Sequence, residues 1–273
     1  MIHRALSVFL LSALIGLCVP AASAAAPLRL ATTTSTQNSG LLDHLLPAFH
    51  QATGIEVHVI AVGTGRALRL GAAGDVDVVL VHAPDAEARF VASGDGTRRY
   101  PVMKNAFLLL GPPRDPAGLR QATDAADALR RIAAARAPFV SRGDDSGTHK
   151  KEKSLWQAAG IQPGGPWYVE AGQGMGKVLQ MADELGAYTL TDRGTWLAYR
   201  DRIGLVPLVS GDPRLDNPYA IIPVNPRRHP HVNYPAAMAF VKWLRSPEGQ
   251  GRIADYRLHG EQAFTPTAVR LAR

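Results

Sequence analysis

Segments rich in glycine, serine and threonine recur in this chain, each where a strand-like run ends and a helical pattern begins. Four such segments lie at 32–36, 63–66, 141–149 and, counted as one, 172–176 with 189–194. At such a junction the first backbone N–H groups of the helix lack partners and the helix dipole presents its positive end, so an anion is stabilised without a lysine. Hydroxyl groups add neutral donors. The pattern predicts a site for a small anion.

The third segment, SRGDDSGTH at 141–149, carries the strongest signal. Its small residues leave the backbone amides accessible, and Ser146 and Thr148 offer hydroxyl groups. The guanidinium of Arg142 can hold two oxygens of an oxyanion in a bidentate fork. The structural alternative is a loop salt bridge from Arg142 to Asp144 or Asp145.

The other segments have simpler alternatives. A cluster of threonine and serine such as 32–36 commonly caps a helix, and the glycines at 63–65 suit a tight turn. The glycines at 172–176 follow a G-x-G-x-G spacing, which does not match the dinucleotide-binding fingerprint. They fit either a close approach of backbone to a ligand or a plain loop.

Strand-like runs alternate with helical patterns through most of the chain, which is typical of an α/β protein with parallel sheets. A cluster of glycine and proline at 111–116 interrupts this alternation, which then restarts. The first series is expected at 28–32, 41–53, 56–62, 66–73, 76–81, 86–93 and 104–110. The second is expected at 122–135, 138–141, 148–159, 168–170, 177–185 and 188–190, with a last strand at 219–224 and a helix at 235–244.

The restart predicts two lobes, each a mostly parallel sheet flanked by helices. We expect residues 25–110 and 207–273 to form a discontinuous lobe I, and residues 111–206 to form lobe II as one inserted block. Two chain crossings between the lobes would make a two-segment hinge. Because ligands of open α/β sheets bind beyond the carboxyl ends of the strands, the polar segments should line the space between the lobes.

The N-terminus has the features of a secretory signal peptide, which we assign to residues 1–24. Arg4 precedes an apolar run that ends in a tract of small residues. The run is too short for a convincing membrane span. Cys18 is the one cysteine of the chain and lies inside this run, so the mature chain has no disulfide. Leu17 before it argues against a lipid anchor, and a soluble periplasmic protein is expected.

Composition narrows the class further. Hydrophobic residues make up 46% of the chain, which excludes disorder. The formal charge of +7 is spread over scattered pairs of arginines, without a basic stripe interleaved with aromatics, so nucleic acid is not expected as a partner. A basic surface would instead speed the capture of a small anion.

Five motifs, taken together and in order, resemble the tungstate-binding component of the ABC-type tungstate importer. They are TTTSTQNSGLL at 32–42, VGTGRA at 62–67, SRGDDSGTHKKE at 141–152, GQGMG at 172–176 and YTLTDRGT at 188–195. The resemblance implies a type II periplasmic-binding-protein fold that holds tungstate or molybdate between its lobes and delivers it to a membrane permease. It implies no catalysis and no cofactor, and a hinged receptor of this kind can work as a monomer.

Carried over by motif, the resemblance also implies a set of ligand-binding residues. The set is Thr33, Thr34, Ser35, Thr64, Arg142, Ser146, Thr148 and Thr191.

Phosphate and sulfate receptors of the same fold are the close alternatives. Phosphate keeps at least one proton at neutral pH and benefits from a carboxylate acceptor, whereas tungstate, molybdate and sulfate are fully deprotonated. Asp144 and Asp145 therefore keep the phosphate interpretation open. The sequence does not separate tungstate from molybdate.

Two alternatives come from other classes of protein. The Asp145-Ser146-Gly147 stretch, with His149 nearby, superficially resembles a serine hydrolase, although a hydrolase serine needs a base placed by the tertiary structure. His229 and His231 form a close pair but lack the further ligands that a zinc site needs, so no metal is expected. The other histidines, His82 among them, are scattered and are interpreted as core or surface residues.

Overall fold

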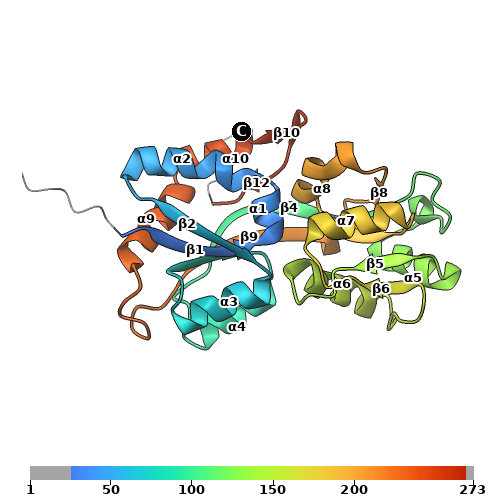
Figure 1. Ribbon diagram of the computed structural model, residues 1–273, viewed down its shortest axis with the longest axis horizontal. Coiled ribbons are helices and arrows are strands. Elements are labelled where there is room, and N and C mark those ends of the chain that lie inside the picture. Colours follow the sequence, from blue (N-terminus) through green and yellow to red (C-terminus); the bar gives the residue numbers. More distant parts are fainter. Residues whose placement is uncertain (1–25, 269–273) are drawn as a thin grey trace, which may run out of the picture.

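The computed structural model of the protein describes residues 26–268. Figure 1 shows two lobes side by side, with strands β4 (Tyr100–Gly111) and β9 (Asp216–Pro223) running between them. The assigned signal peptide, residues 1–24 with Cys18, lies outside the described residues. No helix within 26–268 is long and apolar enough to cross a membrane.

The first lobe is built on three parallel strands with β1 in the middle. They are β1 (Leu28–Thr33), β2 (Val57–Val62) and β3 (Val78–Val81). The helices that follow them are α1 (Thr34–Asn38), α2 (Leu41–Thr53), α3 (Thr64–Ala73) and α4 (Pro84–Ala92). Figure 1 shows α2 on one face of this sheet and α3 and α4 on the other, so β1 and β3 are buried on both sides.

Strand β4 belongs to both lobes. Its first half pairs antiparallel with β9 and with β12 (Thr265–Pro266), and its second half with β7 (Thr189–Asp192) and β8 (Val206–Val209). Because β9 also pairs antiparallel with β3, one mixed eight-stranded sheet continues from the first lobe into the second. The parallel pairing expected for most of each lobe is found in β1–β3 and in β5–β6, whereas the strands near the crossing are antiparallel.

The second lobe surrounds the parallel pair β5 (Phe139–Ser141) and β6 (Tyr168–Glu170). Its helices are α5 (Ala125–Ala135), α6 (Gly147–Ala158), α7 (Met175–Glu184) and α8 (Arg193–Tyr199), with 3-10 turns at Leu119–Gln121, Arg200–Arg202 and Pro213–Leu215. Phe107, Phe139 and Trp156 are among the buried side chains of its main hydrophobic cluster.

The hydrophobic clusters of the two lobes separate within β4 and at the start of β9. Met103 and Tyr219 pack in the first lobe, whereas Phe107 and Leu215 pack in the second. Asn105, which is paired with Asn217, lies between them. β8, which we expected in lobe I, pairs with β4 in this second region.

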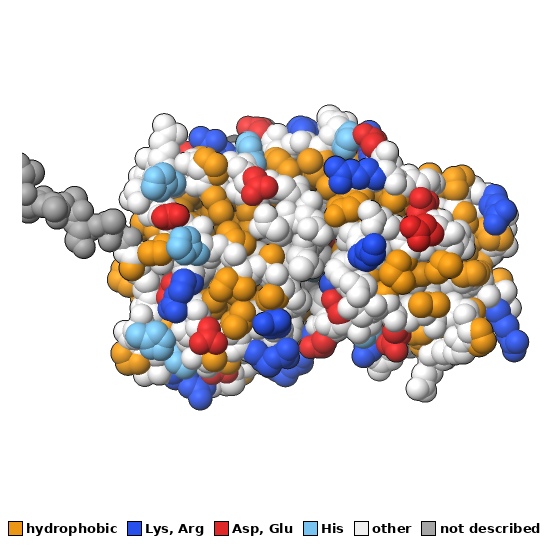
Figure 2. Space-filling view, in the orientation of Figure 1, with side chains coloured by type: hydrophobic (Ala, Val, Ile, Leu, Met, Phe, Trp, Pro, Cys, Tyr) orange, Lys and Arg blue, Asp and Glu red, His pale blue; other side chains and the backbone are white. Residues whose placement is uncertain are grey.

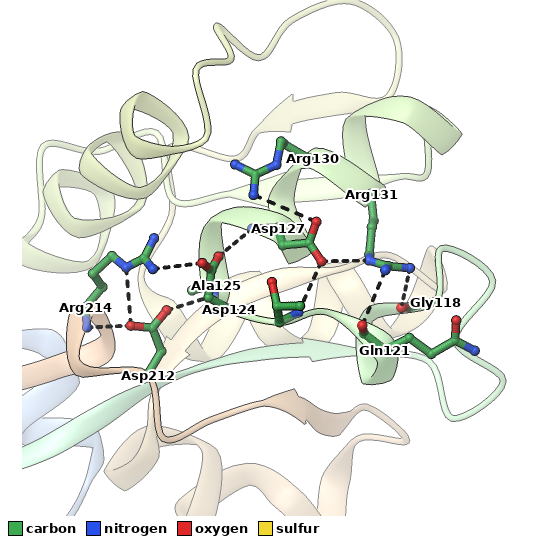
Figure 3. Close-up of polar contacts among 10 residues, drawn as sticks. Gly118, Gln121, Asp124, Ala125, Asp127, Arg130, Arg131, Asp212 and Arg214 are labelled. Atoms are coloured by element: carbon green, nitrogen blue, oxygen red, sulfur yellow. Dashed lines mark hydrogen bonds and ion pairs between the residues drawn. The ribbon is translucent and has the colours of Figure 1, made fainter.

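Figure 3 shows how the segment before β9 is attached to the second lobe. Asp212 accepts a hydrogen bond from the backbone N–H of Ala125 at 2.8 Å, and Arg214 Nη2 lies 2.9 Å from Asp124 Oδ2. Asp124 is the cap of α5, so both contacts join the returning chain to the start of that helix. The chain therefore leaves the second lobe only as β9 begins.

The elements expected from the sequence are found with small shifts of their ends, and three helices were missed. These are α1, α8 and α10 (Pro247–Asp255), the last of which follows α9 (Tyr234–Leu244). In α10, a methyl group at Gly249 would lie 2.2 Å from the carbonyl oxygen of Trp243. The glycine thus allows two helices to pack closely. A short hairpin, β10 (Arg257–Leu258) with β11 (Glu261–Gln262), follows.

Candidate anion-binding site

Arg142 lies on the loop between β5 and α6, as the sequence predicts. The side chain is only 2% exposed, and its Nη2 forms an ion pair with Asp144. Nε and Nη1 of the same guanidinium are buried and have no hydrogen-bond partner. The loop salt bridge considered above is thus present, but it uses one nitrogen and leaves two charged donors free. Buried donors without partners are costly, so these two nitrogens indicate a ligand.

Thr64 and Thr148 add two more donors of the same kind. Each hydroxyl is buried without a hydrogen-bond partner. Thr64 begins α3 in the first lobe, and Thr148 lies in the first turn of α6 in the second. A methyl group placed on Gly147 would lie 3.0 Å from Thr64 Oγ1, so the first lobe reaches the N-terminus of α6 directly. Donors from both lobes therefore meet at this helix end.

Ser146 is the N-cap of α6. Its Oγ accepts a hydrogen bond from the backbone N–H of His149 at 3.2 Å, so the serine proton remains available to an anion. His149 Nδ1 accepts from the backbone N–H of Asp145 at 3.1 Å, and its Nε2 lies 3.9 Å from Glu170 Oε1. Among residues 26–268 no histidine nitrogen is hydrogen-bonded to Ser146 Oγ, and the nearby His149 instead accepts from the backbone through its Nδ1.

The threonine-rich opening segment forms α1 and its cap. Thr33 Oγ1 accepts from the backbone N–H of Thr36 at 3.1 Å and lies 2.8 Å from Thr36 Oγ1. Thr34 is half-buried, and Ser35 is buried. Because α1 packs against α7 and α8, this segment also lies at the junction between the lobes. Because the side chain of Thr33 accepts from the backbone N–H of Thr36, it acts as a helix cap, as the simpler alternative for this segment proposed.

Thr191 and the glycines at 174 and 176, which belong to the predicted polar segments, make contacts within the protein that the sequence did not reveal. The Thr191 hydroxyl lies 3.4 Å from the backbone carbonyl oxygen of Asp192. Gly174 is the cap of α7, and a methyl group at Gly176 would lie 2.2 Å from Tyr199 OH. The glycines at 174 and 176 thus start α7 and let it pack against α8.

The carboxylates near the site are engaged in contacts within the second lobe. Asp144 pairs with Arg142 and accepts from the backbone N–H of Ser146 at 3.2 Å, and Asp145 pairs with Lys150. The sequence left these two acids open as acceptors for the proton of phosphate. In the structure both are neutralised by cations.

Glu152, on α6, stabilises the start of the loop that carries Arg142 through side-chain hydrogen bonds. Its carboxylate accepts hydrogen bonds from Ser141 Oγ at 2.7 Å, Tyr168 OH at 2.6 Å and Trp156 Nε1 at 3.2 Å. Burial raises the pKa of Glu152, and these hydrogen bonds oppose that rise. Because Ser141 immediately precedes Arg142, the contacts hold the end of β5 against α6.

His82, which the sequence interpretation took as a core or surface residue, is buried next to the candidate site. It follows β3, and a methyl group at Gly147 would lie 2.9 Å from its Cε1. Burial lowers the pKa of His82, and the charges of Arg142 and Lys151 lower it further. One sequence signal could have placed His82 near the polar segments, because His82 also directly follows an apolar strand.

The histidine pair His229 and His231 has a structural role. His229 Nε2 lies 2.9 Å from the carbonyl oxygen of Ala72, and His231 Nε2 lies 3.0 Å from that of Gly74, so both cap the C-terminal end of α3. Within 26–268 no group of three or more histidine, cysteine or acidic side chains could hold a metal ion.

Two lobes that share a sheet, with unpartnered donors from each meeting at one helix N-terminus, define a two-lobed solute-binding protein. A family model described as PBP superfamily domain matches residues 20–248. The tungstate-binding protein TupA of Peptoclostridium acidaminophilum is 51% identical over 245 residues, which cover 88% of this chain and 86% of that protein. TupA of Campylobacter jejuni is 38% identical, with 84% and 87% covered. The chain belongs to this family of tungstate-binding proteins within the PBP superfamily.

Solved structures of similar proteins agree with this membership. The tungstate ABC transporter protein from Geobacter sulfurreducens is 55% identical, with a TM-score of 0.79, over 84% of this chain and 98% of that one. TupA from Desulfovibrio alaskensis G20 is 50% identical, with a TM-score of 0.76, over 89% of this chain and all of that one.

Proposed function

We propose that this protein captures a fully deprotonated tetrahedral oxyanion, tungstate first and molybdate second, between its lobes and delivers it to an ABC importer. The observation that carries the proposal is the set of buried, unpartnered donors on Arg142, Thr64 and Thr148. The names of the relatives supply the ion and the transporter.

Within the predicted ligand set, these three side chains form the centre of the proposed site. Ser146 joins them because its hydroxyl proton is free, and Thr34 and Ser35 are the proposed contacts from α1. Thr33 and Thr191 were predicted as contacts too, but their hydroxyl groups have partners within the protein, so we propose that they lie outside the centre of the site.

The state of the acids favours tungstate over phosphate. A phosphate-selective site needs an acceptor for the proton that phosphate keeps at neutral pH. Asp144 and Asp145 are each paired with a cation, so neither carboxylate is unpaired in the structure. Four buried donors without partners, beside two carboxylates that are already paired, suit an anion that carries no proton.

The route to the importer rests on the two-lobed fold. We propose that the lobes close on the anion, with the chain crossing between them at 103–107 and 215–219, close to but not at the boundaries expected from the sequence. Export by the N-terminal signal peptide, a periplasmic location and a monomeric receptor that docks on a permease complete the proposal. Basic and acidic side chains are interspersed on the face in Figure 2, so capture would rely on the site rather than on a basic stripe.

Calorimetry on the mature chain tests the proposal, with tungstate, molybdate, sulfate and phosphate compared at neutral pH. Tungstate and molybdate should bind tightest and phosphate weakest. At a hundred times its Kd, a bound anion should stabilise the fold by about 2.7 kcal/mol, which is a rise in Tm of about 5–10 °C for a chain of this size. Heats and melting curves that respond to none of the four anions would exclude the function.

A further inference from the structure

A continuous series of buried side-chain hydrogen bonds begins at the cap of α1. Thr33 Oγ1 lies 3.3 Å from His82 Nε2, and His82 Nδ1 lies 2.9 Å from Asn217 Oδ1. Asn217 Nδ2 donates to Asn105 Oδ1 at 2.7 Å, and Asn105 Nδ2 donates to Asp192 Oδ1 at 3.2 Å. All five side chains are buried. We call these five residues the Thr33–Asp192 series.

The donor and the acceptor of each hydrogen bond in the Thr33–Asp192 series can be assigned by starting from Asp192. Asp192 Oδ1 accepts the backbone N–H of Thr195 at 3.0 Å, so this oxygen is an acceptor and Asn105 must present its NH2 group to it. The carbonyl oxygen of Asn105 then faces the NH2 group of Asn217, and the carbonyl oxygen of Asn217 faces His82. An amide oxygen only accepts, so His82 Nδ1 must carry a proton.

This direction decides what the Thr33 hydroxyl can do. A neutral imidazole with a proton on Nδ1 has a lone pair on Nε2, which is satisfied when Thr33 donates its only proton to His82. Thr36 Oγ1, 2.8 Å from Thr33 Oγ1, then donates to Thr33. The same oxygen accepts the backbone N–H of Thr36 as the cap of α1. The Thr33 hydroxyl therefore has no proton to offer to an anion.

The Thr33–Asp192 series also passes from one lobe to the other. Asn105 and Asn217 are directly paired on β4 and β9, where the two hydrophobic clusters separate. The His82 ring is held on two sides, because it stacks on Tyr219 with 4.7 Å between ring centroids and abuts Gly147 at the start of α6. Its position is thus set by both lobes.

We infer that His82 is a positioning residue of the anion site, which holds Thr33 as the cap of α1 and so fixes the backbone that carries Thr34 and Ser35. The inference rests on the proposed function. It changes the role expected for Thr33, which acts through the conformation of α1 and not by contact with the anion.

Nuclear magnetic resonance of the anion-free protein with 15N-labelled histidine tests the donor direction. The long-range correlations of the His82 ring should show the Nδ1–H tautomer, which is the minor neutral form of a free histidine side chain in water. A purely space-filling histidine would have no reason to adopt it. The Nε2–H tautomer would overturn the inference, because Thr33 would then keep its proton for the ligand.

Calorimetry with tungstate on two His82 variants tests the consequence for binding. His82→Leu should weaken binding by about tenfold, because Thr33 and Asn217 both lose their partner. His82→Gln should recover most of the loss, because its amide can accept from Thr33 and donate to Asn217. His58→Leu, on an exposed position of β2, is the matched control and should bind as wild type. Equal losses for the Leu and Gln variants would overturn the inference.

The variants Thr33→Val and Thr33→Val/His82→Leu complete the test. If His82 acts through Thr33, the double variant should bind no more weakly than the weaker single variant. Losses that multiply would show that the two residues act independently and would overturn the inference. Wild-type protein that binds no oxyanion would instead overturn the proposed function, and the tautomer measurement is independent of that outcome.

Discussion

Replacing Arg142 tests the centre of the proposed site. The guanidinium offers two buried nitrogens without partners, and each charge-assisted hydrogen bond contributes about 1.5–3 kcal/mol. Arg142→Met should therefore cost about 3–6 kcal/mol of binding free energy, which is about a hundredfold to ten-thousandfold in Kd. Methionine keeps much of the buried volume, so the loss would report the missing donors rather than a cavity.

The single variant has one complication that the structure also resolves. Without Arg142, the carboxylate of Asp144 loses its ion-pair partner and would repel an anion. The double variant Arg142→Met/Asp144→Asn removes that charge, so its remaining loss reports the donors alone. Both variants should be titrated with tungstate by calorimetry, with circular dichroism to confirm folding. A double variant that binds within about threefold of wild type would refute the reasoning.

Three further perturbations give distinct results. Gly147→Ala would place a methyl group 3.0 Å from Thr64 Oγ1 and 2.9 Å from His82 Cε1, so tungstate affinity by calorimetry should fall about tenfold or more; unchanged affinity would show that α6 need not approach so closely. Glu152→Ala leaves two buried donors and the hydroxyl of the half-buried Tyr168 without their acceptor, and should lower the free energy of unfolding in urea by about 2–4 kcal/mol. A loss under about 0.5 kcal/mol would contradict this role. Burial lowers the pKa of His82 and His149 below the usual 6.5, so the unfolded chain takes up protons first as the pH falls. The Tm of the anion-free protein should therefore fall as the pH drops below about 6.5, and by less in His82→Gln; equal slopes for the two proteins would exclude a contribution from His82.

The sequence predicted best those parts of the molecule whose signals are local. The residues 41–53 were expected as a helix and form α2 with those bounds, because Gly40 and Gly54 on either side adopt left-handed conformations with φ of 72° and 71°. Arg142, Thr64 and Thr148 were predicted from polar segments after strands, and all three have buried donors without partners. Their contact with an anion remains a prediction.

Features that depend on pairing between distant segments could not be predicted in this way. His82 and Asn217 are 135 residues apart in the sequence, and only the sheet brings them within 2.9 Å. The same applies to Gly249 and Gly176, whose lack of a side chain matters because of neighbours from other helices. A glycine or a histidine carries no local mark of what it will touch.

The sharing of β4 by both lobes has a consequence for how the protein would release its cargo. A backbone that remains in a hydrogen-bonded sheet through the crossing resists wide bending. Such a strand can flex at its register shifts, which lie between Pro101 and Met103 and between Leu109 and Leu110. We expect modest rotations rather than wide excursions, with a correspondingly small change in the radius of gyration. Spontaneous escape of the ion would then be slow, and unloading would depend on a membrane partner that pulls the halves apart.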